Sequence, residues 1–132
     1  MADEQELLDL ADRWAKYYNE DCDRMVYEVY APDFKAYPMA MDLCVEGQDN
    51  LKTLEDAMID AAPKRRIDIA RKHVSGDVVV VEAFMRDADK GDDWEIPFVV
   101  VLTVRDGKVI IDRTYAHWNE WPGFKPAWAK LS

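Results

Sequence analysis

Three polar side chains have the types needed for proton-transfer chemistry. Asp112 and Thr114 lie in the closing stretch KVIIDRTYAHW, and Tyr37 lies in the earlier segment FKAYPMAMDLCVE. A carboxyl group in an apolar pocket has its charged form disfavoured and its pKa raised, which suits proton transfer near neutral pH. The hydroxyl of Tyr37 or Thr114 would orient this carboxyl or stabilise an oxyanion. Asp112 is therefore the predicted acid or base, and a structural pairing with an Arg or with the backbone is the alternative.

His117 is a second candidate for the general base, because the unperturbed pKa of histidine is about 6.5. A lone histidine near a strand end is more often structural or exposed, so both interpretations stay open. His73 lies near the end of another expected strand, and nothing in the sequence brings the two histidines together. Cys22 and Cys44 are too few and too far apart to form a zinc site. We therefore expect neither a metal ion nor another cofactor.

Composition disfavours several kinds of partner. Twenty-seven acidic against seventeen basic side chains give a formal charge of −10, which would repel a nucleic-acid backbone. No apolar run approaches the ~18 residues of a membrane span, and the acidic start MADEQELLDL lacks the features of a signal peptide. We therefore expect a cytoplasmic protein that binds neither nucleic acid nor a membrane.

Hydrophobic periodicity predicts helices first and strands afterwards. Helices are expected over residues 4–18, about 21–30 and 49–61. Residues 34–46 surround Pro38 and indicate an irregular or edge strand. Strands are expected over residues 66–75, 78–87, 94–105 and 108–118, joined by short turns into an antiparallel meander. This order predicts one α+β domain that comprises all 132 residues.

Alternation along the strands predicts which side chains face the core. One row of residues 94–105 is wholly apolar, namely Trp94, Ile96, Phe98, Val100, Leu102 and Val104. The last strand differs, because the row of Ile110, Asp112 and Thr114 and the row of Val109, Arg113 and His117 both carry polar groups. We therefore expect this strand to line a pocket with one face and to form a contact surface with the other.

The order of elements resembles the nuclear transport factor 2-like superfamily, the cone-shaped fold of SnoaL-like polyketide cyclases, ketosteroid isomerases and limonene-epoxide hydrolases. The resemblance covers about residues 4–121. It is carried by Tyr30-Ala31-Pro32-Asp33-Phe34, Val45-Glu46-Gly47, Ser75-Gly76-Asp77 and the run from Asp106 to Tyr115. It implies N-terminal helices packed on a curved, mostly antiparallel sheet, with a deep apolar pocket between them.

The resemblance also implies the ligand and the assembly. An apolar small molecule is the expected ligand. The side chains expected to bind it are Trp14, Tyr18, Met39, Ala83, Met85, Phe98 and Trp118. A homodimer is expected by analogy with the family. The aromatic tail, residues 119–132, should fold over the cavity mouth or onto the partner subunit.

The catalytic residues of these families do not transfer to this sequence. By resemblance, the Arg and Asp of the epoxide hydrolases fall on Ala83 and Met85. Their second Asp, and the acid/base Asp of the cyclases, fall on Thr114. The Tyr and Asp of the ketosteroid isomerases fall on Trp14 and Pro38.

Two functions are therefore compatible with the sequence. The first is an enzyme performing acid/base chemistry, as an isomerase, cyclase, dehydratase or epoxide-opening enzyme, on a polyketide-, terpenoid- or steroid-like substrate. The second is a ligand-binding or dimeric scaffold domain of the same fold without turnover. The missing catalytic sets favour the second function, and a polar group at the floor of the pocket favours the first.

Overall fold

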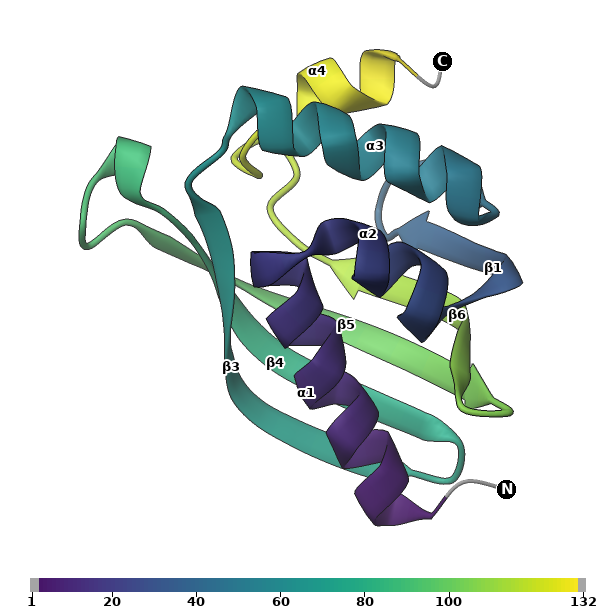
Figure 1. The fold of residues 1–132 in the computed structure, drawn as a ribbon. Coiled ribbons are helices and arrows are strands. Elements are labelled where there is room, and N and C mark those ends of the chain that lie inside the picture. The colour runs from purple at the N-terminus through teal and green to yellow at the C-terminus, as the bar shows by residue number, and fades with distance from the viewer. Residues whose placement is uncertain (1–2, 131–132) are drawn as a thin grey trace.

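The computed structural model describes residues 3–130, which form a sheet covered by helices on one face (Figure 1). The helical elements are α1 (Glu4–Glu20), α2 (Cys22–Arg24), the π-helical turn η1 (Met25–Val29), α3 (Gln48–Ala61), the 3-10 turn η2 (Ala88–Lys90) and α4 (Phe124–Ala129). The strands are β1 (Tyr30–Pro38), β2 (Val45–Glu46), β3 (Arg65–Ser75), β4 (Val78–Asp87), β5 (Glu95–Arg105) and β6 (Lys108–Tyr115). Within the described residues, no helix is both long and apolar enough to cross a membrane.

The six strands form one curved, mixed sheet in the order β2-β1-β6-β5-β4-β3. β3 to β6 form the antiparallel meander that the sequence predicts, whereas β1 pairs with β6 in parallel. Helix α1 packs against β3 and β4, and α3 runs beside α4 at the other end of the domain (Figure 1). The predicted α+β fold, with N-terminal helices on a curved and mostly antiparallel sheet, is confirmed.

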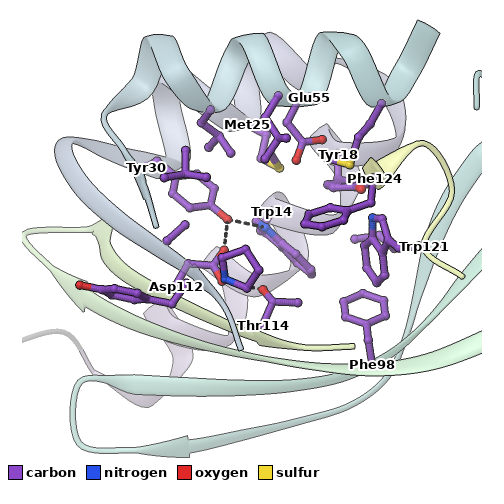
Figure 2. A pocket seen from close by; sticks show the side chains of 18 of the residues that line it. Trp14, Tyr18, Met25, Tyr30, Glu55, Phe98, Asp112, Thr114, Trp121 and Phe124 are labelled. Atoms are coloured by element: carbon purple, nitrogen blue, oxygen red, sulfur yellow. Dashed lines mark hydrogen bonds between the residues drawn. The ribbon is translucent and has the colours of Figure 1, made fainter. Parts of the chain in front are cut away.

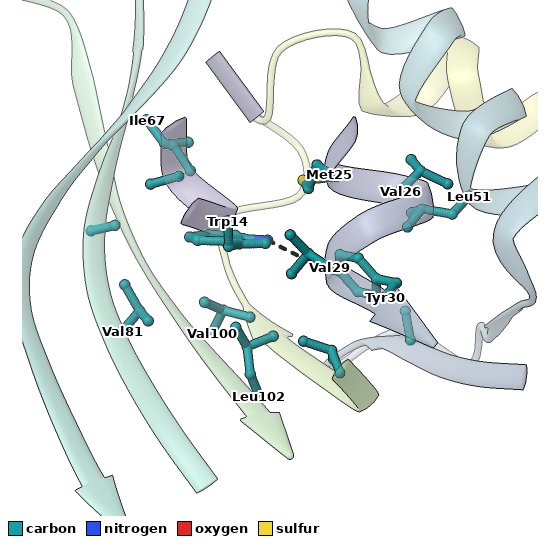
Figure 3. Packing of buried hydrophobic residues seen from close by; sticks show 14 of the residues in the cluster. Trp14, Met25, Val26, Val29, Tyr30, Leu51, Ile67, Val81, Val100 and Leu102 are labelled. Atoms are coloured by element: carbon teal, nitrogen blue, oxygen red, sulfur yellow. Dashed lines mark hydrogen bonds between the residues drawn. The ribbon is translucent and has the colours of Figure 1, made fainter. Parts of the chain in front are cut away.

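The second predicted helix, over residues 21–30, is only partly correct. One turn of α2 passes into the π-helical turn η1, and Tyr30 already begins β1. The turn buries Met25, Val26 and Val29, so it is anchored by apolar packing (Figure 3). π-Helical segments are rare and occur frequently at functional sites. Here the turn ends the helical segment directly before Tyr30.

A β-bulge in β6 decides which side chains of the last strand face the core. Neighbouring residues of β5 pair with Ile111 and Val109, so Ile110 is an extra residue that β5 does not match. A bulge of one residue shifts the alternation of side chains by one position. Val109 and Asp112 are both buried, with exposed fractions of 0% and 8%. The predicted row that joined Ile110 to Asp112 is therefore wrong, and the bulge turns Asp112 and Thr114 inward.

The core lies between the sheet, α1 and the segment from α2 to β1 (Figure 3). The predicted inward row of β5 is correct for Ile96, Phe98, Val100, Leu102 and Val104, all of them buried. Trp94, which precedes the strand, is only partly buried. Trp14 of α1 packs in the same cluster as the β5 row. This packing fixes α1 on the sheet and sets the position of the Trp14 indole.

The C-terminal segment lies close to the backbone of α3 at Gly123. The φ angle of Gly123 is +75°, and a Cβ added there would lie 2.8 Å from the carbonyl oxygen of Met58. This close approach keeps Trp121 and Phe124 buried beside α3. Residues 119–130 of the predicted tail thus lie against the domain, and residues 131–132 lie outside the described residues.

Replacing Gly123 by Ala is expected to lower the free energy of unfolding by about 2–4 kcal/mol, because left-handed strain and a backbone clash add together. Gly76→Ala is the matched control, since its φ is +61° and nothing lies within 4 Å of the added Cβ. The control should lose only about 1–2 kcal/mol. Urea unfolding followed by tryptophan fluorescence measures both losses. Equal losses would contradict a close, fixed approach of the tail to α3.

Candidate active site

A cavity lies between the sheet, α1, α3 and the C-terminal segment (Figure 2). Its free volume is about 80 Å³. Eight aromatic side chains line it, namely Trp14, Tyr18, Tyr30, Tyr37, Phe98, Trp118, Trp121 and Phe124. An apolar protein cavity of ~150 Å³ binds benzene. In the described conformation, the cavity therefore fits a molecule of only a few non-hydrogen atoms.

Asp112 supplies a carboxyl group on one side of this cavity. The hydroxyl of Tyr30 donates a hydrogen bond to Asp112 Oδ2 over 2.6 Å, and Thr114 Oγ1 donates to Oδ1 over 2.7 Å. The indole nitrogen of Trp14 donates to the Tyr30 hydroxyl oxygen over 3.1 Å (Figure 2). The network thus joins α1, β1 and β6, and each oxygen of the carboxyl keeps a lone pair for another partner.

Burial controls the protonation of this network. It raises the pKa of the Asp112 carboxyl, and the hydrogen bonds from Tyr30 and Thr114 act in the opposite direction. Burial, together with the nearby Asp112 carboxylate, raises the pKa of Tyr30 well above its usual range. Tyr30 therefore keeps its proton and remains a donor. Asp112 is the group of this network that gains or loses a proton at an accessible pH.

A second polar cluster lies on the side of the cavity opposite Asp112, and Glu55 and Tyr18 are its members that line the cavity (Figure 2). Glu55 of α3 is 6% exposed, and its Oε2 accepts a hydrogen bond from Arg65 Nη2 over 2.8 Å. Arg65 also donates to the Tyr18 hydroxyl through Nη1. The thiol of Cys22 lies 3.7 Å from Glu55 Oε2 and donates to it. Glu55 thus has a direct counter-charge. Asp112 has none, because no Lys, Arg or His is among the described residues that line the cavity.

The charges of this pair offset one another. Burial lowers the pKa of Arg65 to about 10, which leaves the guanidinium charged at neutral pH. Burial raises the pKa of the Glu55 carboxyl, while the guanidinium favours its ionised form. Arg65 Nε is buried without a hydrogen-bond partner among the described residues. The guanidinium is held by the Glu55 carboxylate and by Tyr18, whose hydroxyl accepts from Nη1 and whose ring centroid lies 4.5 Å from the guanidinium carbon.

Seven of the residues predicted for the site line the cavity. They are Trp14, Tyr18, Tyr37, Phe98, Asp112, Thr114 and Trp118. Of the two predicted polar partners of Asp112, Thr114 donates to it directly, whereas Tyr37 is among the lining residues.

Four other predicted residues lie outside the lining. Ala83 and Met85 of β4 are core residues, with exposed fractions of 3% and 0%, because α1 covers this part of the sheet. Met39 lies in the turn after β1, where its carbonyl accepts a hydrogen bond from the Trp118 indole over 2.9 Å. His117 follows the end of β6 and is exposed to solvent. The structure therefore does not bring His117 together with Asp112.

Sequence reasoning missed two polar residues of the site, Tyr30 and Glu55. The helix predicted over residues 21–30 includes Tyr30 as its last residue, so the prediction does not place this side chain beside β6. Glu55 had a usable signal, because it lies four residues after Leu51 and three before Met58, on the apolar stripe of its helix. A charged residue within such a stripe usually has a buried partner.

Within the described chain, no group of three or more His, Cys, Asp or Glu side chains could hold a metal ion.

The sequence matches the SnoaL-like domain family over residues 11–111. The chain belongs to the SnoaL-like domain family. No curated protein matches the sequence of this SnoaL-like domain significantly. The family match over residues 11–111 confirms the predicted resemblance to the nuclear transport factor 2-like superfamily.

Solved structures share the fold of this SnoaL-like domain at low sequence identity. A protein from Jannaschia sp. CCS1, described as a SnoaL-like polyketide cyclase, is 21% identical with a TM-score of 0.75, covering 86% of this chain and 87% of that one. A Catenulispora acidiphila protein with a ketosteroid isomerase-like fold, in complex with trimethylamine, is 18% identical with a TM-score of 0.72, covering 89% and 94%. An M. tuberculosis LEH-like epoxide hydrolase is 17% identical with a TM-score of 0.68, covering 96% and 95%. The TM-scores show that the fold is shared. At identities this low, the chemistry has to be inferred from the residues of the site.

Replacing Arg65 by Met is expected to lower the free energy of unfolding by about 3–5 kcal/mol, because the Glu55 carboxyl would stay buried without its counter-charge. The double variant Glu55→Leu/Arg65→Met removes both charges and should recover most of that loss. Urea unfolding at pH 7 measures the two variants against the unmodified protein. If the double variant were no more stable than Arg65→Met, the pair would not be an energetically coupled unit.

Proposed function

We propose that this SnoaL-like domain is a cofactor-independent enzyme that transfers a proton at a carbon atom of a small, mostly apolar substrate. Asp112 is the general base. The observation that supports this role is the position of its carboxyl, buried in an aromatic cavity and hydrogen-bonded by Tyr30 and Thr114 without a neighbouring cation. A raised pKa makes such a carboxylate a stronger base than one in water, and a protonated carboxyl a usable acid near neutral pH.

The proposed reaction starts at a C–H bond next to a carbonyl group. Ionised Asp112 takes the proton, and the electron pair of the C–H bond moves onto the carbonyl oxygen as an enolate. In a substrate with a C=C bond beside that carbon, the intermediate is a dienolate. Return of the proton from Asp112 to the far carbon of the dienolate, with re-formation of the carbonyl group, completes an isomerisation. Attack of the enolate carbon on a second carbonyl instead closes a ring, and the proton passes to the new alkoxide. Tyr37 is among the residues that line the same cavity, and its hydroxyl is the candidate donor to the enolate oxygen.

The cavity walls favour this chemistry over epoxide opening. The resemblance places the Arg and Asp of the epoxide hydrolases on Ala83 and Met85, which are apolar and packed in the core. Activation of both a water molecule and an epoxide oxygen needs more polar groups than Asp112 with Thr114 and Tyr30 supply. An isomerase-type or cyclase-type reaction needs one group that carries the proton between two sites of the same molecule.

The volume of the cavity restricts the substrate. At about 80 Å³ the free space is smaller than the 300–1,000 Å³ of pockets for drug-sized ligands. A compact carbonyl compound with a short apolar body therefore fits better than the polyketide-, terpenoid- or steroid-like molecule expected from the resemblance.

We further propose a homodimer formed through the uncovered face of the sheet. Val99, Val101 and Ile111 are only half-buried there, and Tyr115 is 47% exposed. A partly apolar sheet face with ion pairs such as Arg86–Glu95 around it resembles a polar-rimmed interface.

The test is hydrogen–deuterium exchange into small ketones. The protein should accelerate incorporation of deuterium next to the carbonyl of cyclopentanone or butanone in D2O, measured by NMR. Asp112→Asn should lose about 100-fold or more of this acceleration, whereas the exposed variant Asp106→Asn should keep it.

The pH dependence of exchange has a defined sign. A general base acts in its ionised form, so the exchange rate should rise as the pH increases through the raised pKa of Asp112 and then level off. Exchange that survives Asp112→Asn unchanged would reject Asp112 as the base. A complete lack of acceleration, with the folded protein and both ketones, would favour a binding domain without turnover.

A further inference from the structure

The cavity carries one uncompensated negative charge when Asp112 is ionised. Among the described residues that line it, none is a Lys, Arg or His. The other carboxyl in the lining, that of Glu55, is already paired with Arg65 at 2.8 Å. The hydroxyls of Tyr30 and Thr114 stabilise the Asp112 carboxylate but bring no charge. A bound molecule that carried a positive charge would therefore complete the electrostatics of the cavity.

Five aromatic rings that contact one another in succession line the same space, and we call them the aromatic belt. They are Trp14, Phe98, Trp121, Trp118 and Phe124. The ring centroids of Trp14 and Phe98 lie 6.5 Å apart, and those of Phe98 and Trp121 lie 4.9 Å apart. Trp118 continues the belt, 5.3 Å from Trp121 and 4.7 Å from Phe124. The face of an aromatic ring attracts a cation within about 6 Å of its centroid, and tryptophan is the strongest of these partners. These five aromatic residues all line the cavity, so a cation bound there would have aromatic neighbours.

Size and charge together define the ligand. We propose that the cavity binds a small organic ammonium ion of the methylated-amine class, with its charge shared between the Asp112 carboxylate and the aromatic belt. An ion with four or five non-hydrogen atoms matches the volume of about 80 Å³. An inorganic cation is a poorer match, because its hydration shell would be replaced by only one carboxylate and apolar walls. The formal charge of −10 also attracts cations to the protein.

This inference rests on the proposed function in one respect, that the Asp112 carboxylate faces the bound molecule. In a substrate that combines an ammonium group with a carbonyl group, the rings would hold the methyl groups on nitrogen. Asp112 would then lie close to the carbon atoms between the two groups, where a C–H bond is most acidic. The ammonium group would thus both anchor the substrate and offset the charge of the base.

Tetramethylammonium chloride and tert-butanol are the matched probes, since both contain five non-hydrogen atoms in a tetrahedral arrangement and only the first is charged. Isothermal titration at pH 8, with sodium chloride keeping the ionic strength constant, measures both. Tetramethylammonium should bind at least about tenfold more tightly than tert-butanol. Asp112→Asn should reduce that preference to the part that the aromatic rings supply, and Asp106→Asn should keep it in full. Equal affinities for the two probes in the unmodified protein would overturn the inference.

Trp121→Leu is the second variant, which covers the case that Asp112→Asn does not fold. It leaves the carboxylate in place and removes part of the aromatic belt, so it should weaken tetramethylammonium binding more than tert-butanol binding. An equal loss for both probes would contradict a cation–π contribution. The ketone exchange assay separates this inference from the proposed function. Exchange that depends on Asp112, together with no preference for the ammonium probe, would leave the enzyme assignment intact and reject only the ligand class.

Discussion

The structure of the site depends on keeping one carboxyl group buried without a counter-charge. Removal of an ionised carboxylate from water costs several kcal/mol unless other groups solvate it. For Asp112 the solvating groups are two hydroxyls, from Tyr30 and Thr114, and the phenol is itself held by the Trp14 indole. Each of these groups comes from a position set by the fold. Displacement of α1, β1 or β6 would therefore leave a charged group unsatisfied in the interior.

The contrast between Asp112 and Glu55 makes the two sides of the cavity electrostatically different. Both carboxyls are buried, but Glu55 has Arg65 beside it and Asp112 has only neutral donors. The ion pair fixes the charge of one side, whereas the charge of the other side depends on pH and on what is bound. This difference assigns a structural role to Glu55 and a chemical role to Asp112. The aromatic residues of the C-terminal segment add apolar surface to the cavity wall, and apolar surroundings strengthen electrostatic interactions.

Much of this arrangement follows from local sequence patterns, and the rest depends on tertiary pairing. The helices at 4–20 and 48–61, the meander and the inward row of β5 follow from periodicity, because each buries one face. Asp112 lines the cavity, as the sequence predicts, but its side chain does not share a row with Ile110. The bulge at Ile110 arises from pairing with β5, which no pattern within β6 reveals. The position of Tyr30 likewise depends on the π-helical turn before it and on the parallel pairing of β1 with β6. His117 was a reasonable candidate by residue type, but the strand ends at Tyr115 and leaves it in solvent.

The central claim is that Asp112 titrates as a buried carboxyl solvated by two hydroxyls and by no cation. The most direct measurement follows the Asp112 carboxyl carbon by NMR as the pH is changed, in the ligand-free protein. We expect a pKa above the ordinary value of about 3.9 for aspartate, and a further increase in Thr114→Val, which lacks one donor to the charged form. A pKa at or below the ordinary value would contradict this claim, because the carboxyl would then be paired with a cation or exposed to water.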